Sequence, residues 1–197
     1  MHRSHDTQLN AFVTTTLNNL HPRHTALLKP VQDYRGVPHM MSAAIPRTAS
    51  EHCFLLMAYQ PMQPQPRKLC VLVNGTSVTT LSLRVDREFF KNSMYECMYD
   101  KAANKLYIID TLIHCGADFR RFNSVDRQIV SILTTILLTQ DPKQPLECCC
   151  PEWTYLNLVE YGRLKNTSLG QFLPKTTDAS SVLVVPELGQ FGEMYFL

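Results

Sequence analysis

Apolar and polar positions divide the middle of the chain into short apolar runs separated by polar turns. Two of these runs, 94–99 and 106–115, are rich in aromatic and β-branched side chains and flank the polar segment 100–105. Apolar runs on both sides of a turn-forming segment are typical of a β-hairpin. We therefore predict a hairpin over residues 94–115.

Further strands are predicted over 53–59, 68–73, 77–85, 182–185 and 193–197. Asn74-Gly75 lies between the second and third of these runs, and this dipeptide favours a tight hairpin turn. The segment 60–66 contains three prolines. Because proline lacks the N–H group that a central strand needs, this segment is predicted to be a loop.

Helical periodicity is clearest over 125–138, where Ile129, Ile132, Leu133, Ile136 and Leu137 recur at helical spacing. Asn123-Ser124 supplies capping residues before this helix, and Asp141-Pro142 ends it. Short helices are also predicted over 8–20 and 152–161, and 147–151 is predicted to be irregular. The pattern indicates an α+β fold with mostly antiparallel sheets and few helices.

The chain divides into an N-terminal segment, 1–46, and a folded domain, 47–197. Residues 22–46 contain four prolines and one glycine, so we expect the first segment to be extended or partly disordered. The whole chain has 197 residues, 45% hydrophobic and 18% charged. This size and composition suit one domain with an apolar core.

Charge and cysteine content narrow the expected partners and location. A formal net charge of +2 is too small to indicate double-stranded DNA as a partner. The apolar run 129–138 is too short to span a bilayer, so no membrane is expected as a partner. Seven cysteines without an apolar leader after the polar first ten residues favour a reducing compartment, the cytoplasm or the nucleus.

The hairpin carries two acids among residues that otherwise favour burial, Glu96 and Asp110. A buried carboxylate is costly unless a donor or a cation pairs with it. Two interpretations remain open from the residues alone. The acids face a ligand pocket, or they pair with nearby Lys or Arg side chains at the edge of the sheet.

The hairpin resembles a conserved block of the covalent nucleotidyltransferases, the mRNA-capping guanylyltransferases and ATP-dependent ligases. Glu96-Cys97-Met98-Tyr99-Asp100 matches its acidic strand, and Leu106-Tyr107-Ile108-Ile109-Asp110 matches its return strand. The acid-Cys-x-Tyr start, the Tyr-x-x-Asp return and the Gly at the end are most similar to snurportin-type cap-binding domains. The basic-start strand 67–77, with its Gly-Thr-Ser turn, is similar as well. The resemblance covers roughly 53–127 and implies a nucleotidyltransferase-like fold over 47–197.

Catalysis is not expected, because the residues that the family uses for it are missing. The nucleophilic Lys-x-Asp-Gly motif is absent from the interval before Lys68, and 180–185 lacks the family's later Asp-Gly strand. The chain also stops at Leu197, where an OB-fold domain follows in the catalytic members. We therefore expect a binding module without catalytic residues, cofactor or metal. One alternative is a divergent guanylyltransferase or ligase that uses Lys68, and another is a protein-interaction scaffold with an occluded pocket.

The resemblance implies a nucleotide as the ligand, and the likeness to cap-binding domains implies an RNA 5′ cap. Glu96 and Asp110 would then bond the base or ribose edge, with basic side chains on the phosphates and flat side chains against the base. The basic candidates are Lys68, Arg120 and Arg121, and the flat candidates are His52, Phe54 and Tyr195. The resemblance also suggests transport or RNP proteins as partners, although 1–46 contains few basic residues. Cys148-Cys149-Cys150 lacks the spacing of a zinc site.

Overall fold

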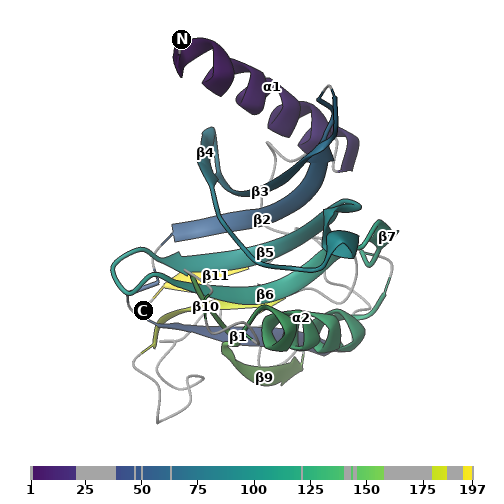
Figure 1. Cartoon of the computed structure of the whole chain (residues 1–197). Helices are drawn as coiled ribbons and strands as arrows, with labels where there is room; N and C mark the ends of the chain where they lie inside the picture. The colour runs from purple at the N-terminus through teal and green to yellow at the C-terminus, as the bar shows by residue number, and fades with distance from the viewer. Residues whose placement is uncertain are drawn as a thin grey trace.

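The computed structural model of the chain is an α+β fold, and the part that it describes contains two α-helices and two β-sheets (Figure 1). It describes residues 2–20, 39–46, 48–49, 51–62, 64–120, 122–139, 143, 146–157, 179–185 and 193–196. Within these ranges the helices are α1 (His2–Leu20) and α2 (Ser124–Thr139), and η2 (Arg87–Phe90) is a short 3-10 turn. The α+β class and the low helix content predicted from the sequence are confirmed.

The larger sheet is curled and has the strand order β4-β3-β2-β5-β6-β7, with β8 beside β6 (Figure 1). All neighbouring strands are antiparallel except β6 and β8, which run parallel. Its strands are β2 (Glu51–Gln60), β3 (Arg67–Asn74), β4 (Ser77–Thr80), β5 (Ser93–Asp100), β6 (Lys105–His114), β7 (Ala117–Asp118) and β8 (Glu147–Cys149).

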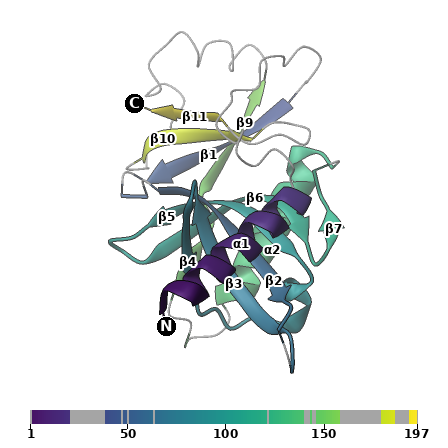
Figure 2. The ribbon, with the colours of Figure 1, turned by 90° about the horizontal axis from the view of Figure 1, so that it is seen from above.

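The smaller sheet has the order β11-β10-β1-β9, and all its pairs are antiparallel. In Figure 2 it fills one half of the view, while the larger sheet with α1 and α2 fills the other. Its strands are β1 (His39–Pro46), β9 (Glu152–Asn157), β10 (Ala179–Val185) and β11 (Glu193–Phe196). Only residues 47–50 separate β1 from β2, so the chain passes directly from one sheet to the other.

The larger sheet is buried on both faces because its strands place successive side chains on opposite sides. On one face, Val13 and Leu17 of α1 pack against apolar residues of β2, β3, β5 and β6. On the other, η2 contributes Phe89 and Phe90 and α2 contributes Leu138. We call these the α1 face and the α2 face. A sheet covered on both sides explains why β2 and β3 read as continuous apolar runs.

Four cysteine side chains belong to the core of the α2 face, namely Cys53, Cys70, Cys97 and Cys148. Cys53 and Cys97 are register partners on β2 and β5. All seven cysteines of the chain are free thiols. Burial raises the pKa of Cys53, Cys70 and Cys148 to about 12, and it raises the pKa of Cys97 well above its ordinary value.

The predicted hairpin is confirmed as β5 and β6. Its turn, 101–104, is closed by Asp100, whose Oδ1 accepts a hydrogen bond of 2.9 Å from the Ala103 N–H. Asn104 adopts a φ of 54°, a conformation that asparagine tolerates better than most residues. The register shifts between Met94 and Tyr95 and again between Glu96 and Cys97, so the ladder is irregular on both sides of Glu96.

The predicted helix over 125–138 is confirmed as α2, and its predicted cap is present. Asn123 Oδ1 accepts a hydrogen bond of 2.9 Å from the Asp126 N–H. The orientation of α2, however, is opposite to the usual one for an amphipathic helix, because its apolar side is exposed and its polar side is buried. Leu133 is 54% exposed, and Ile129, Ile136 and Leu137 are about equally exposed. The buried residues are Ser124, Arg127, Ser131, Thr134, Thr135 and Leu138.

Three local predictions are wrong. The segment 152–161, predicted as a helix, begins with strand β9, which pairs with β1. The segment 147–151, predicted as irregular, begins with β8, which places the buried Cys148 beside Leu106. The strand predicted over 77–85 ends at Thr80. In the first two cases, pairing with a strand distant in sequence decides the structure, and local propensity carries no such signal.

The N-terminal segment packs against the larger sheet through α1 and supplies strand β1 to the smaller sheet. The helix predicted over 8–20 lies within α1, and its Val13 and Leu17 belong to the core of the α1 face. Strand β1, within the segment predicted as extended lead-in, pairs with β9 and β10. The boundary predicted at residue 46 therefore falls at the end of a paired strand.

Candidate functional site

The two acids of the hairpin are buried side by side. Glu96 on β5 and Asp110 on β6 are register partners, and their exposed fractions are 0% and 1%. Directly opposed residues of an antiparallel pair share one face of the sheet, and like charges in this position repel each other. The pair therefore requires compensating cations.

Arg127 of α2 supplies the cation for Asp110. Its Nε donates to Asp110 Oδ1 at 2.9 Å and to Oδ2 at 3.2 Å, and its Nη1 donates to the Phe122 carbonyl at 2.8 Å. The Thr111 N–H donates a further bond of 2.9 Å to Asp110 Oδ1. Burial raises the pKa of Asp110 to about 6, against the lowering effect of Arg127, and the charge of Glu96 adds to the increase.

His52 of β2 supplies the partner for Glu96. Its Nε2 lies 2.8 Å from Glu96 Oε1, and the ring packs edge-on against Phe54 with centroids 5.5 Å apart. Burial lowers the pKa of His52, but the hydrogen bond to Glu96 and the charge of Glu96 outweigh it and raise that pKa. The side chain of His52 is 21% exposed, which makes it the part of the site that solvent reaches.

We call His52, Glu96, Asp110 and Arg127 the charged quartet. With His52 protonated, it contains two anions and two cations, which explains how both acids remain inside an apolar sheet. Two of its members were not predicted in these roles. Arg127 lies within the helix predicted over 125–138 and was given no role beside the acids, and His52 was predicted to be a flat surface against the base. No spacing in the sequence links Arg127 to Asp110, so this ion pair left no signal by which it could be predicted.

A polar contact layer positions Arg127 on the sheet. Thr111 Oγ1 of β6 lies 2.8 Å from Ser131 Oγ of α2, and Ser131 Oγ in turn donates to the Arg127 carbonyl at 3.0 Å. These contacts hold the first turns of α2 against β6. The polar side of α2 therefore faces inward because its partners on β6 are polar.

The strand register separates Lys68 from the acids. Glu96 pairs with Phe54 and Phe54 with Val73, which lies on the α1 face. Lys68 pairs with Tyr59. It lies two residues before Cys70 on β3, so its side chain is on the α2 face with that of Cys70. The single pocket that the sequence suggested, with Lys68 beside Glu96 and Asp110, is therefore not formed. His52, Phe54, Glu96 and Asp110 do lie together.

The remaining predicted residues are Arg120, Arg121 and Tyr195. Arg120, after β7, is paired with Asp118, with Nε–Oδ1 and Nη2–Oδ2 distances of 2.8 and 2.6 Å. Arg121 lies outside the described residues. Tyr195 lies on β11, in register with Val182 of β10.

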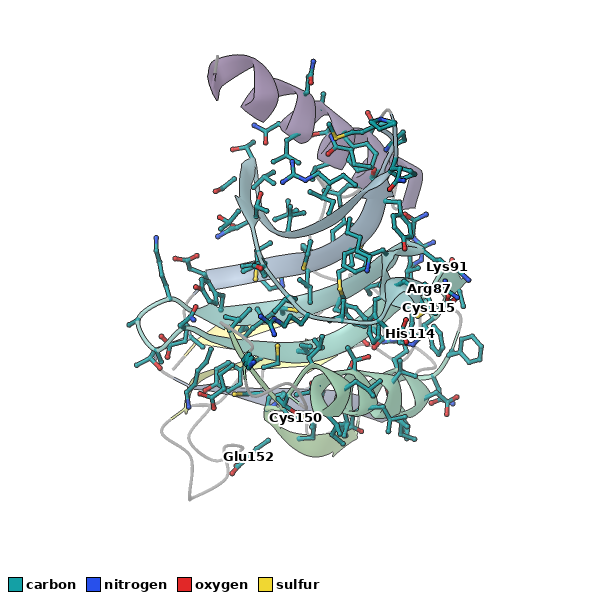
Figure 3. All side chains as sticks on the ribbon, viewed as in Figure 1. Arg87, Lys91, His114, Cys115, Cys150 and Glu152 are labelled. Carbon is teal, nitrogen blue, oxygen red and sulfur yellow. The ribbon has the colours of Figure 1, made fainter. Side chains whose placement is uncertain are left out.

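A second titratable pair joins Tyr95 of β5 to His114 at the end of β6. The Tyr95 hydroxyl is 2.7 Å from His114 Nδ1, and burial lowers the pKa of His114. A neutral imidazole accepts the Tyr95 O–H bond at that nitrogen. Figure 3 shows His114 and Cys115 beside Arg87 and Lys91, where β6 turns toward β7.

Two features bear on the class of ligand. Among the described side chains, no three His, Cys, Asp or Glu residues come together as a metal site would require. Neither α1 nor α2 has the length and apolar character needed to cross a bilayer.

No protein-family model matches the chain, and no curated protein matches its sequence.

Proposed function

We propose that the protein is a non-catalytic nucleotide-binding module of the snurportin-like kind, and that its ligand is an RNA 5′ cap. The observation that carries the proposal is the buried register pair Glu96–Asp110, in which a fixed arginine neutralises one acid and a partly exposed histidine covers the other. An acid kept beside a replaceable cation is an arrangement that suits recognition of a cationic base.

In this proposal Glu96 recognises the base. Guanine presents N–H donors along one edge, and methylation at N7 gives the ring a positive charge. Such a ring can take the place of His52 beside Glu96, so that the buried carboxylate exchanges one cation for another and is never left unpaired. Phe54, which already packs against the His52 ring, lies next to the bound base.

Asp110 has a supporting role in this proposal. Both of its oxygens bond Arg127, and both side chains are almost completely buried. This ion pair anchors α2 to the hairpin and keeps β6 beside Glu96. The sequence had assigned Asp110 to the ligand; its geometry favours a role in holding Glu96 in position.

Several observations count against the covalent alternative through Lys68. A nucleophilic lysine needs a pocket that desolvates its amine and acids close to the bound nucleotide. Lys68 is exposed, its Nζ lies 5.2 Å from the centre of the Phe90 ring, and it is on the other face of the sheet from Glu96. One observation favours the scaffold alternative, namely the exposed apolar side chains of α2, since large exposed apolar patches often mark interaction surfaces.

The test is a thermal-shift and calorimetric titration with N7-methyl-GTP, a trimethylguanosine cap analogue, GTP and ATP. We expect the cap analogues to raise the melting temperature, because a ligand that binds only the native state stabilises it. Glu96→Gln, which keeps the shape but removes the charge, is expected to weaken cap binding about tenfold or more. Glu147→Gln is the matched control, because Glu147 is an exposed carboxylate on β8.

His52→Gln provides a second readout that does not depend on the folding of the Glu96 variant. If the base replaces His52, removing the imidazole is expected to preserve or strengthen cap binding. No response to any nucleotide at millimolar concentration would refute the proposal and favour the scaffold. Equal cap affinity of wild type and a folded Glu96→Gln variant would also refute it.

A further inference from the structure

A groove of about 450 Å³ lies on the α2 face of the large sheet, between β3 and the segment 81–85 that follows β4. The backbone forms its wall. The Leu81 N–H donates to the Cys70 carbonyl at 2.8 Å, and Leu81, Leu83 and Val85 pack on the core. Alternation along this extended segment leaves Ser82 and Arg84 exposed. A main-chain hydrogen bond and core packing therefore hold the wall of the groove in place.

The lining of the groove is basic. It contains Arg67, Lys68 and Arg84, together with the hydroxyl groups of Thr80 and Ser82, and none of its ten residues is acidic. Three cations in one groove are a marked local concentration in a chain whose formal net charge is only +2. Arginine, lysine and hydroxyl side chains are the groups that contact phosphate oxygens.

An aromatic side chain lies beside these cations. Tyr59 of β2 is the register partner of Lys68, so both side chains lie on the same face of the sheet. Tyr59 is 36% exposed, and its ring centre is 5.8 Å from that of the buried Phe90. Its hydroxyl donates to the Arg87 carbonyl at 3.4 Å, and Lys68 lies over Phe90. These contacts hold an exposed aromatic ring next to the basic groove.

We propose that this basic groove binds a short stretch of single-stranded nucleic acid. The phosphates lie along Arg67, Lys68 and Arg84, and a base stacks on Tyr59. A positively charged groove beside an aromatic platform is the combination by which proteins hold single strands without reading their sequence. The groove is on the opposite face of the sheet from Glu96, so it does not depend on cap recognition by Glu96.

The experiment measures the fluorescence anisotropy of a labelled, uncapped oligouridylate of roughly ten nucleotides, a length within the usual site size for single strands. We expect saturable binding that weakens as salt increases, because phosphate contacts release counterions. Lys68→Gln combined with Arg84→Gln is expected to reduce the affinity about tenfold or more and to flatten the salt dependence. Arg67→Gln replaces either change if the double variant does not fold.

Matched controls separate this groove from other charged surfaces. Lys101→Gln removes an exposed lysine from the β5–β6 turn and is expected to leave binding unchanged. Glu147→Gln is also expected to leave it unchanged, because this exposed carboxylate does not line the groove. Tyr59→Ala is expected to reduce affinity for the oligouridylate but not for an abasic chain of the same length.

Three outcomes would overturn the proposal. One is an absence of binding, and another is binding that survives the Lys68 and Arg84 changes. The third is displacement of the oligonucleotide by tripolyphosphate at equal phosphate concentration, together with no effect of Tyr59→Ala, which would indicate a simple phosphate site. Displacement by an unlabelled single strand but not by a blunt RNA duplex supports it.

Discussion

Glu96 and Asp110 lie directly opposite each other on β5 and β6, yet each carboxylate pairs with a cation from a different element. Asp110 bonds Arg127 from α2, and Glu96 bonds His52 from β2. The hairpin thus joins a helix on one side to a strand on the other, through a buried ion pair at Asp110 and a partly buried pair at Glu96. Because the two acids repel each other, the loss of either cation affects both.

We expect Arg127→Leu to lower the free energy of unfolding by about 3–5 kcal/mol, because it leaves Asp110 buried without its cation. Asp110→Leu combined with Arg127→Leu is expected to be less damaging than Arg127→Leu alone, since no charge is then left uncompensated. Urea denaturation of the variants measures both effects.

Arg120→Gln is the control for this ion pair. It breaks the partly exposed pair with Asp118, whose contribution is expected to be about 0–1 kcal/mol. An Arg127→Leu variant no less stable than Arg120→Gln would show that the buried pair does not hold α2.

The free energy of unfolding is expected to fall as pH rises through the range in which Asp110 titrates. Its pKa is raised by burial from 3.8 to about 6, so between these values the native state retains a proton that the unfolded chain has released. This contribution is fully present below the unfolded pKa and is lost as pH passes the native value. Asp110→Asn should remove that slope in denaturation curves measured at a series of pH values.

His52 extends the same trend to higher pH. Its native pKa is raised above 6.5 by Glu96, so its stabilising contribution is present below 6.5 and is lost as pH rises through the native value. His52→Gln should flatten this upper part of the profile and leave the Asp110 part in place. A wild-type profile that rises over the whole range would contradict both assignments.

The orientation of α2 predicts very different effects for two identical substitutions. Leu138 is 1% exposed and Leu133 is 54% exposed. Leu138→Ala is expected to cost about 2–5 kcal/mol, as is usual for a buried leucine. Leu133→Ala is expected to stay within about 0.5 kcal/mol of wild type. Equal losses of unfolding free energy for the two variants, measured by thermal or urea unfolding, would mean that the helix is rotated about its axis.

Two glycines at positive φ are expected to differ in their tolerance of alanine. Gly75 has a φ of +55° and open space around an added Cβ, whereas Gly116 has a φ of +86° and the Lys91 carbonyl oxygen 3.0 Å from that position. Gly75→Ala is expected to cost about 1–2 kcal/mol from backbone strain alone. Gly116→Ala is expected to cost more, because a backbone atom must also move. Melting temperatures of the two variants give the comparison.

Local patterns were sufficient to predict the hairpin and α2. The turn 100–105 between two apolar runs, and the cap Asn123 before a helical repeat, are signals contained in a few consecutive residues. Such signals do not reveal which side of a helix is buried. The apolar stripe of α2 predicted the wrong buried side because the opposing strand presents Thr111 and Asp110 to the helix.

The site was predicted only in part, because its composition depends on strand register. Glu96 and Asp110 were identified from their unusual positions in apolar runs. Lys68 was assigned to the same pocket, yet the pairing of Tyr59 with Lys68 puts it on the other face. Arg127 was missed because an ion pair between a strand and a helix leaves no spacing rule in the sequence. Pairing of β1 with β9, across more than a hundred residues, is similarly invisible to local propensity.

The four thiols gathered in the core of the α2 face have a further consequence. Only the thiolate reacts readily with alkylating reagents, and burial keeps Cys53, Cys70, Cys97 and Cys148 both protonated and out of reach. Cys150, by contrast, lies at the surface (Figure 3). In the unaltered chain Cys150 is therefore expected to be alkylated quickly, and the four buried cysteines slowly. The alkylation rate of the buried cysteines then measures how often the sheet opens.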